Sequence, residues 1–334
     1  MVEGWQGLSE GDVVTSVVSG GLTNVLTKVS VSPDVEVADS APTAVLVRHF
    51  GRGTHVLINR KREGVIFAHF GSLGLSPALH GTFEGGRVEQ FLEARTLTST
   101  DLHQPATATA IGSHLARVHG TEVPNISHQN GLPDLLSGWW KLAVRAIMPS
   151  AYLARKVLQF DFADLHREMG ELIEILESVN SPVMFTHMDL LAGNILELTE
   201  DDHQGEITFV DFEYGMYAWR GFDFGNHFAE AGITYDVDGF PGFYINPDDY
   251  PSDETITAFF TGYLHGQGVT DPDEIAAALP GLKQEARVFT LASHFMWGIW
   301  AIVRAATPSD DYGFLEFAAA RLDQYYALRR QWGI

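Results

Sequence analysis

The stretch THMDLLAGNIL, residues 186–196, places three polar side chains in an otherwise apolar run. His187 stands two positions before Asp189, and Asn194 follows five positions after it. One interpretation is structural: His187 and Asp189 form a hydrogen-bonded pair at a strand end, and Asn194 caps a turn. The other is the catalytic loop of a phosphoryl-transfer enzyme, where the aspartate takes a proton from the substrate hydroxyl and the asparagine binds a metal ion. The second interpretation requires another metal-binding carboxylate nearby.

A second carboxylate follows at the end of the next β-rich run. Residues 194–198 and 207–210 are each typical of a strand, and the polar stretch between them is typical of a turn. The two runs predict a hairpin with Asn194 and Asp211 at the same open end. Kinases build their magnesium site in this way. With Asp189 as a candidate base and both metal ligands in order, the sequence predicts a kinase.

Composition limits what surrounds this site. A chain of 334 residues with 45% hydrophobic content can form two lobes around a cleft. It has no cysteine, which excludes disulfides, thiol catalysis and cysteine-bound zinc. The first residues lack a basic region followed by an apolar one, and no apolar run approaches ~18 residues. We therefore expect a cytoplasmic enzyme that does not insert into a membrane.

The charge of the chain constrains its partners. The formal net charge of −22 argues against nucleic acid or an anionic membrane, which basic patches bind. Lysine is scarce, with five residues against sixteen arginines. Solubility or a saline, high-GC source explains the acidic composition most simply. An acidic protein also attracts a cationic substrate.

Hydrophobic periodicity divides the chain into a β-rich and a helical part. We expect an α+β protein with a protein-kinase-like two-lobe fold, in which residues 1–93 form a small β-rich nucleotide-binding lobe. Residues 94–334 would form a larger, mainly α lobe for catalysis and substrate binding. The predicted strands are 13–18, 25–31, 44–50, 55–58 and 87–95; the predicted helices are 62–70, 107–120, 135–148, 165–179, 255–268, 291–305 and 314–330; the stretches 31–43, 121–134 and 236–253 are typical of loops.

The motif SGGLTN, residues 19–24, joins the first two predicted strands. Gly20 and Gly21 would let the backbone approach phosphates and present its amides to them, with Asn24 at the end of the loop. A glycine pair in a hairpin is also common in a plain turn. Its place in the first hairpin, ahead of a catalytic loop, favours the phosphate-binding interpretation.

A cation for the nucleotide phosphates is expected on the third predicted strand. Protein kinases use a lysine there, and this chain has Arg48, whose guanidinium grips phosphate oxygens through paired hydrogen bonds. Glu63, at the start of the following helix, is the natural partner that holds it. Alone, each would be a surface residue. By position, backbone groups of Gln90, Phe91 and Leu92 are candidates to bind the adenine edge.

Beyond these motifs, the chain resembles the choline/ethanolamine kinases over most of its length. The resemblance implies a kinase-like two-lobe transferase that uses ATP with Mg²⁺ and phosphorylates a small cationic amino alcohol, ethanolamine or choline, at the entry to phospholipid headgroup synthesis and thus phosphatidylethanolamine biosynthesis. Dimers are common in this family, so it also allows a homodimer. The stretches that carry the resemblance are VSGGLTN, VLVRHFG, LHGTFEGGRVEQFLEARTL, FTHMDLLAGNIL, FVDFEYGMYAWRGFDFGNHFAE and SHFMWGIWAIV.

The resemblance also assigns roles to single residues. It makes Asp189 the catalytic base, with Asn194 and Asp211 at the metals and Arg48 at the phosphates. Arg220 and Asp223 are interpreted as scaffold that holds the segment after Asp211 in shape. Position 188 is a methionine where the family usually has asparagine, which would loosen the local hydrogen bonds of the loop.

For the cationic head of the substrate, the resemblance implies Glu230 and Tyr235, the pair Trp297 and Trp300, and Phe317. The two tryptophans are three residues apart on a predicted helix and share a face, and their rings attract ammonium groups. A tryptophan pair at this spacing is also common in a core, and Glu230 alone would be a surface carboxylate. Choline kinases tend to carry tyrosines where this chain has Phe314 and Phe317, so the aromatic faces are kept without their hydroxyls.

The choice of amino alcohol depends on hydrogen bonding. Ethanolamine has three ammonium hydrogens that need acceptors, whereas choline donates none and suits an aromatic cage. Leu190-Leu191 and the sequence 231–234 after Glu230 are similar to the ethanolamine kinases; choline kinases more often have glutamine in place of Leu191. The cage aromatics and FYINPDDYP, 243–251, are similar to choline kinases. We expect an enzyme that accepts both and favours ethanolamine.

Three alternatives remain: a choline kinase proper, an aminoglycoside-type phosphotransferase, and a catalytically inactive pseudokinase scaffold. A pseudokinase would lack the base or a metal ligand, and this chain has both. An aminoglycoside phosphotransferase would lack the tryptophan helix and would prefer a broad acidic cleft to an aromatic pocket.

Overall fold

The structure is a computed structural model in which the chain forms two compact units. Unit 1 comprises Met1–Leu97, Val123–Asn125 and Gly193–Tyr214, and unit 2 comprises Thr98–Glu122, Ile126–Ala192 and Gly215–Ile334. The residues described are 2–18, 24–38, 40–51, 57–235, 237–307 and 312–334, without the side chains of Asn24 and Asp201.

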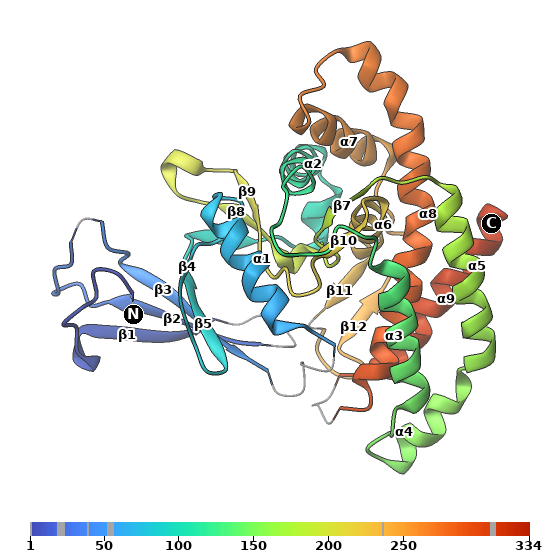
Figure 1. The fold of residues 1–334 in the computed structure, drawn as a ribbon, viewed down its shortest axis with the longest axis horizontal. Helices are drawn as coiled ribbons and strands as arrows, with labels where there is room; N and C mark the ends of the chain where they lie inside the picture. The colour runs from blue at the N-terminus through green and yellow to red at the C-terminus, as the bar shows by residue number, and fades with distance from the viewer. Residues whose placement is uncertain (1, 19–23, 39, 52–56, 236, 308–311) are drawn as a thin grey trace. The chain divides into compact units, whose positions relative to one another are not determined.

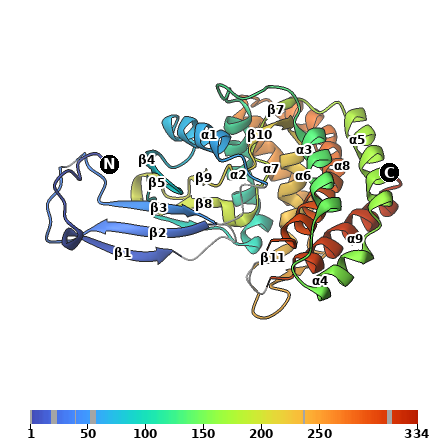
Figure 2. The same cartoon turned by 60° about the horizontal axis from the view of Figure 1, so that its bottom comes forward.

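Unit 1 is rich in β-strands, as predicted. A five-stranded antiparallel sheet has the order β1-β2-β3-β5-β4, and a three-stranded sheet has the order β6-β8-β9. Figure 2 shows β1, β2 and β3 side by side in the larger sheet. The elements of unit 1 are β1 Val13–Val18, β2 Asn24–Val31, β3 Ala44–Phe50, α1 Arg60–Ser72, β4 Leu79–Phe83, β5 Gly86–Gln90, β6 Ala94–Thr96, β8 Ile195–Leu198 and β9 Ile207–Phe209.

The register of the larger sheet gathers charged residues on one face. Arg48 of β3 lies opposite Arg87 of β5. Glu89 is two residues after Arg87, and side chains two apart on a strand share a face. All three side chains are buried. Strand β3 therefore carries a buried cation into the interior of unit 1.

The predicted hairpin after the catalytic loop is confirmed. Strands β8 and β9 are antiparallel, with Ile195 opposite Phe209. Strand β6 pairs with β8, Thr96 opposite Leu196, which explains why the hairpin belongs to unit 1. The division of the chain at residues 93 and 94 stays a prediction.

Unit 2 is mainly helical. Helix α8 is its central element, and α3, α5, α6 and α9 pack around it, as Figure 1 shows, while α2 packs on α7. The elements are α2 Pro105–His119, α3 Leu132–Arg145, α4 Ala151–Lys156, α5 Phe162–Ser178, β7 Val183–Thr186, β10 Met216–Trp219, α6 Gly221–Glu230, β11 Ile233–Tyr235, β12 Phe243–Ile245, α7 Asp253–Gly266, α8 Pro272–Arg304 and α9 Phe314–Trp332.

Helices α6 and α8 approach closely because α6 presents glycine to its neighbour. A Cβ atom at Gly225 would lie 2.3 Å from the carbonyl carbon of Phe289, and one at Gly221 would lie 2.4 Å from its ring. Such distances are below van der Waals contact. Glycine at these positions therefore fixes α6, which carries Asp223 and Glu230, against the core helix.

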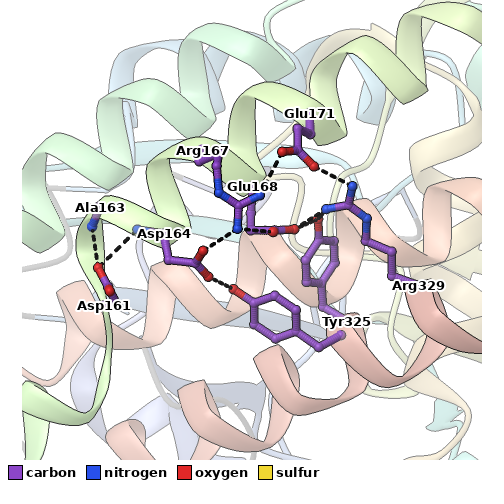
Figure 3. A network of polar contacts seen from close by, with 9 residues as sticks. Asp161, Ala163, Asp164, Arg167, Glu168, Glu171, Tyr325 and Arg329 are labelled. Atoms are coloured by element: carbon purple, nitrogen blue, oxygen red, sulfur yellow. Dashed lines mark hydrogen bonds and ion pairs between the residues drawn. The ribbon is translucent and has the colours of Figure 1, made fainter.

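A network of ion pairs ties α9 to α5 (Figure 3). Arg329 of α9 bonds Glu168 and lies 2.5 Å from Glu171 of α5, and Tyr325 donates to Glu168 at 3.0 Å. Tyr326 donates to Asp164 at 2.8 Å. These contacts hold the C-terminal half of α9 and so fix the direction of its first half.

Two predicted strands were wrong in part. The predicted strand 87–95 is two strands, because β5 pairs with β3 and β4 whereas β6 pairs with β8, and the chain changes sheets between them. In the predicted strand 55–58, residues 55 and 56 lie outside the described residues. Leu57 and Ile58 lead into α1 through a turn instead, and Asn59 caps that helix by accepting from the amide of Arg62.

Unit 2 differs from the prediction at α6, at β12 and at the start of α8. Helix α6 was not predicted, because all ten of its residues are buried and a helix buried on every side shows no apolar stripe. The predicted loop 236–253 contains β12, which pairs with β11. Helix α8 begins at Pro272, far ahead of the predicted start at residue 291.

Helix α8 alone, among the helices in the described ranges, is long and apolar enough to cross a membrane by those two criteria. Of its most apolar window, 94% is buried inside the protein. It is the core helix of unit 2.

Candidate active site

The phosphate-binding candidate Arg48 is buried in unit 1, and not a surface residue. Its Nε donates to Glu89 Oε1 at 2.6 Å, and its Nη1 donates to Asp211 Oδ2 at 3.2 Å. Burial opposes the charge of the guanidinium, but the neighbouring Asp211 and Glu89 outweigh burial and raise its pKa. Arg48 therefore stays cationic and aligned with the carboxylate predicted to bind the metal.

The predicted partner of Arg48 was wrong in one respect. Glu89 takes the place that the sequence assigned to Glu63. Glu63 bonds Arg60 at 2.6 Å and Arg87 at 2.6 Å. The reason is register: Glu89 shares a sheet face with Arg48, whereas Glu63 at the start of α1 meets the arginines beside it. Glu63 still contributes electrostatically to the charge of Arg48.

Asp211 is poised for a cation. Its backbone is left-handed, with φ of 66°, a conformation that non-glycine residues adopt rarely and often at functional sites. Its Oδ1 is buried and has no hydrogen-bond partner within the described part of the chain. Single oxygens of Glu63, Asp211 and Glu213 lie within 4.8 Å of one another. Because Mg²⁺ prefers oxygen ligands, this donor set fits the predicted metal.

Glu213 was not identified from the sequence as a candidate metal ligand. It lies two positions after Asp211, and Arg60 bridges it to Glu63, at 3.1 Å and 2.6 Å. The signal was its place as a second carboxylate in the DFE triplet. The carbonyl of the other predicted ligand, Asn194, accepts from the amide of Val210 at 3.0 Å, which places Asn194 and Asp211 at the same hairpin end; their role as metal ligands stays a prediction.

Of the other residues predicted to bind the nucleotide, only some lie within the described part of the chain. Gly20 and Gly21 lie outside the described residues, and so does the side chain of Asn24, whose backbone opens β2. Gln90 is exposed and pairs with Ala78 through backbone and side chain.

The two residues after Gln90 belong to neither strand. The Phe91 ring lies beneath the Lys28 ammonium, 3.7 Å from its centroid. Within the described ranges, the backbone groups of Phe91 and Leu92 have no hydrogen-bond partner. A segment that binds adenine through its backbone needs such groups.

In unit 2, a buried carboxylate organises the catalytic loop. Asp223 of α6 accepts from the amide of His187 at 2.7 Å and from the amide of Met188 at 2.8 Å. Met188 has φ of 70°, so these bonds hold a strained turn just before Asp189. Asp223 is scaffold as predicted, but it holds the loop before Asp189 rather than the segment after Asp211. The backbone of Met188 makes this bond, so the bond does not depend on the side chain at 188. The expected loosening by methionine stays a prediction.

Histidines complete the support of the loop. His119 of α2 lies 3.0 Å from Asp223 and 2.9 Å from the Tyr263 hydroxyl. The ring of His227 donates to the Leu190 carbonyl at 3.2 Å. The ring nitrogen Nδ1 of His187 accepts from the backbone amide of Asp189 at 3.3 Å.

The other predicted scaffold residue, Arg220, ties the corner between β10 and α6 to α8. It donates twice to Glu285, each time at 3.1 Å, and Ser181 donates to the same carboxylate at 2.6 Å. This corner fixes the start of α6 and hence the place of Asp223.

The predicted cation-binding residues meet in unit 2. Glu230 is buried, only 3% exposed, and is therefore not a surface carboxylate. Tyr235 donates to it at 2.6 Å, and Arg321 of α9 at 2.7 Å. Burial and the adjacent Glu230 raise the pKa of Tyr235, so its hydroxyl keeps its proton. Arg321 was not identified from the sequence, where it is one of three arginines in a helical pattern.

Aromatic rings form a continuous chain beside these residues. Trp297 and Trp300 are buried, as in a core, and their centroids are 5.4 Å apart. Trp300 contacts Phe314 at 5.8 Å, and Tyr235 lies 6.1 Å from Phe317.

Tyr312 joins the two ends of this chain, at 4.8 Å from Phe314 and 6.2 Å from Phe317. Tyr312, which precedes the helix, was not identified from the sequence as part of this group of rings.

Comparisons with known proteins decide the family. The sequence profile described as Choline/ethanolamine kinase matches residues 15–326. The chain belongs to this family. A human protein named choline/ethanolamine kinase is 33% identical over 330 residues, which cover 98% of this chain and 83% of that protein. A probable ethanolamine kinase of Arabidopsis thaliana is 32% identical over 327 residues, 97% of this chain and 82% of that protein.

The fold of this kinase is also that of the family. A crystal structure of choline kinase from Cryptosporidium parvum matches with a TM-score of 0.80 at 23% identity, over 99% of this chain and 92% of that one. The predicted α+β, protein-kinase-like fold is confirmed, and so is the prediction of a kinase. Family membership implies use of ATP. The roles of single site residues stay predictions.

A buried histidine that bonds the loop around Asp189 makes the stability of the folded protein depend on pH. Burial lowers the pKa of His227 to about 4, below its usual 6.5. Between these values the unfolded chain binds a proton that the folded kinase rejects, so stability is full above about pH 6.5 and falls as the pH is lowered. At pH 5 the loss is about 2 kcal/mol.

Urea unfolding at pH 7.5 and pH 5.0 measures this loss. We expect the replacement His227→Gln to shrink the difference between the two pH values, and His265→Gln, at the exposed end of α7, to leave it as in the wild type. The same pH dependence in all three proteins would contradict the assignment.

Proposed function

We propose that this kinase transfers the γ-phosphate of ATP to the hydroxyl of ethanolamine and of choline, with ethanolamine preferred. The observation that carries the substrate class is the buried carboxylate of Glu230, bonded by Tyr235 and lying beside a chain of aromatic rings. A carboxylate accepts the hydrogens of an ammonium group, and aromatic faces attract its charge. Relatives named choline/ethanolamine kinase and probable ethanolamine kinase support the same class.

The proposed reaction is a single displacement at phosphorus. The hydroxyl proton of the amino alcohol passes to the carboxylate of Asp189. The hydroxyl oxygen then bonds to the γ-phosphorus while the bond from that phosphorus to the bridging oxygen of ADP breaks. Asp189 suits this role because the loop before it is held by two buried backbone bonds to Asp223.

Unit 1 is proposed to bind the nucleotide. Arg48 would contact phosphate oxygens through a guanidinium that its carboxylate neighbours keep charged. Asn194 and Asp211 would bind Mg²⁺, with Glu213 as a further oxygen donor. The metal, when bound, supplies positive charge to the phosphates. Gly20, Gly21 and Asn24 at the phosphates, and Gln90, Phe91 and Leu92 at the adenine, complete the proposed nucleotide site.

We also propose a cytoplasmic enzyme that begins phospholipid headgroup synthesis and binds neither nucleic acid nor a membrane. The acidic charge and the burial of α8 support this. Assay of ethanolamine kinase activity in membrane and soluble fractions of the source cell checks it, and activity confined to the membrane fraction would contradict it.

The substrate class is tested with a panel. ATP consumption is measured with ethanolamine, choline, an aminoglycoside and a peptide at equal concentration. The proposal expects turnover with the two amino alcohols. Turnover with the aminoglycoside alone would favour an aminoglycoside phosphotransferase, and none with any compound would favour a pseudokinase scaffold.

Two substitutions separate the base from the metal ligand. Asp189→Asn is expected to lower kcat by ~10²-fold or more with little change in nucleotide binding, because the base acts on the substrate proton. Asp211→Asn is expected to weaken Mg²⁺-dependent ATP binding itself. Steady-state kinetics and MgATP titration measure both, with the exposed Asp323→Asn as matched control. More than a tenth of wild-type turnover in Asp189→Asn, or unchanged MgATP affinity in Asp211→Asn, would reject the respective role.

The preference between the amino alcohols follows from the acceptors at Glu230. Ethanolamine gains hydrogen bonds there that choline does not, whereas the aromatic chain serves both. We expect kcat/KM for ethanolamine to exceed that for choline, when both are measured at saturating MgATP. A higher kcat/KM for choline would reject the preference for ethanolamine and leave the assignment as a kinase unchanged.

A further inference from the structure

The buried arginine of α9 lies at the centre of the proposed amino-alcohol site. Arg321 and Glu230 form an ion pair with 2.7 Å between Nη1 and Oε1, and their side chains are 0% and 2% exposed. The second arm of the guanidinium, Nη2, donates to Ser293 Oγ of α8 at 2.7 Å. Arg321 is thus fixed from two sides by α6 and α8.

The hydrogen bonds of Arg321 continue to the proposed aromatic site. Ser293 donates to Asn226 Oδ1 at 2.8 Å, and Trp297 Nε1 donates to the same oxygen at 2.8 Å. In the other direction, Tyr235 donates to Glu230. One network of side chains therefore links the carboxylate and a tryptophan of the site.

A ring of the proposed site also touches the guanidinium. The centroid of Phe317 lies 5.6 Å from the central carbon of Arg321, one turn away on the same helix. Arg321 therefore contacts, or joins by hydrogen bonds, four of the five residues proposed to enclose the cation: Glu230, Tyr235, Trp297 and Phe317.

The ion pair decides how Glu230 is able to recognise an ammonium group. With Arg321 beside it, the pair carries no net charge, so Glu230 does not attract cations as an isolated charge would. One oxygen of Glu230 accepts from Arg321 and the other from Tyr235. Each carboxylate oxygen has a second lone pair, which is held in a fixed direction. Recognition by such a group depends on direction rather than on total charge.

We propose that Arg321 is a specificity-determining positioning residue, which orients Glu230 so that its remaining lone pairs select a primary ammonium over a quaternary one. The inference rests on the proposed function, because it takes an amino alcohol as the substrate. Hydrogen bonds from the ethanolamine ammonium require oriented acceptors. The trimethylammonium of choline requires only aromatic faces and charge, which tolerate a carboxylate that moves.

The test compares kcat/KM for ethanolamine and choline in wild type and Arg321→Met. The variant removes the guanidinium and keeps a long apolar side chain. Ethanolamine kcat/KM is expected to fall about 10-fold or more through KM, and choline kcat/KM less than about 3-fold, with an unchanged KM for ATP. Equal losses for both amino alcohols, or a gain for ethanolamine, would overturn the inference.

Two further variants keep the test decisive. Ser293→Ala removes the second anchor of Arg321. It is expected to lower the ratio of kcat/KM for ethanolamine to kcat/KM for choline about 2- to 3-fold. If Arg321→Met does not fold, Ser293→Ala tests the role of Arg321 instead. An unchanged ratio in Ser293→Ala would then overturn the inference. Arg329→Met, on the same helix and bonded to α5, is expected to lower thermal stability with the ratio unchanged. A shift of the ratio in Arg329→Met would show a general loosening of α9 and overturn it.

Failure of the proposed function gives a different result from failure of this inference. Wild-type enzyme that phosphorylates neither amino alcohol would reject both. Wild-type enzyme with turnover, and variants with an unaltered ratio, would reject the role of Arg321 alone.

Discussion

The carboxylate of Asp223 is the constraint on which the catalytic part of unit 2 depends. It is fully buried and accepts from two consecutive backbone amides and faces one histidine. Buried amides without partners would cost about 1–3 kcal/mol each, and Met188 adopts a left-handed backbone as well. Asp223 supplies the acceptors that make this turn stable. Two contacts keep Asp223 in place. The glycines of α6 pack closely against α8, and Arg220 bonds Glu285.

Arginine is used throughout this protein to hold buried carboxylates. Arg48 bonds Glu89, and Arg321 bonds Glu230, with all four side chains buried. The five lysines are all exposed or half-buried. A guanidinium donates in several fixed directions and is weakly hydrated, which suits it to buried pairs better than an ammonium. The preference for arginine in buried ion pairs therefore helps to explain why lysine is scarce in this chain.

Much of the fold could be predicted from the sequence because its signals are local. Runs rich in β-branched residues marked β1 to β3, and the spacing of apolar residues marked α2, α5 and α9. Helix α6 could not be found in this way, since burial on all sides removes the pattern. The predicted single strand over residues 87–95 failed for another reason: a change of pairing partner between β5 and β6 leaves no mark in composition.

The candidate site was predictable in its residue types but less so in its pairs. Motif order placed Asn194 and Asp211 at one hairpin end, and the register confirms it. The choice of Glu89 over Glu63 beside Arg48 depends on sheet register, which one sequence does not fix. The pairing of Arg321 with Glu230 joins residues 91 positions apart, and only the packing of α6 and α9 on α8 makes it evident.

The most direct measurement of the central claim is the turnover of Asp223→Asn. An asparagine oxygen is able to replace only one of the two acceptors, and its NH₂ group would face the second amide. We predict a kcat lower by about 10²-fold, because a small misplacement of Asp189 suffices for such a loss, with the KM for ATP nearly unchanged. A kcat within about threefold of wild type, in a variant shown to be folded by its circular dichroism, would contradict the account.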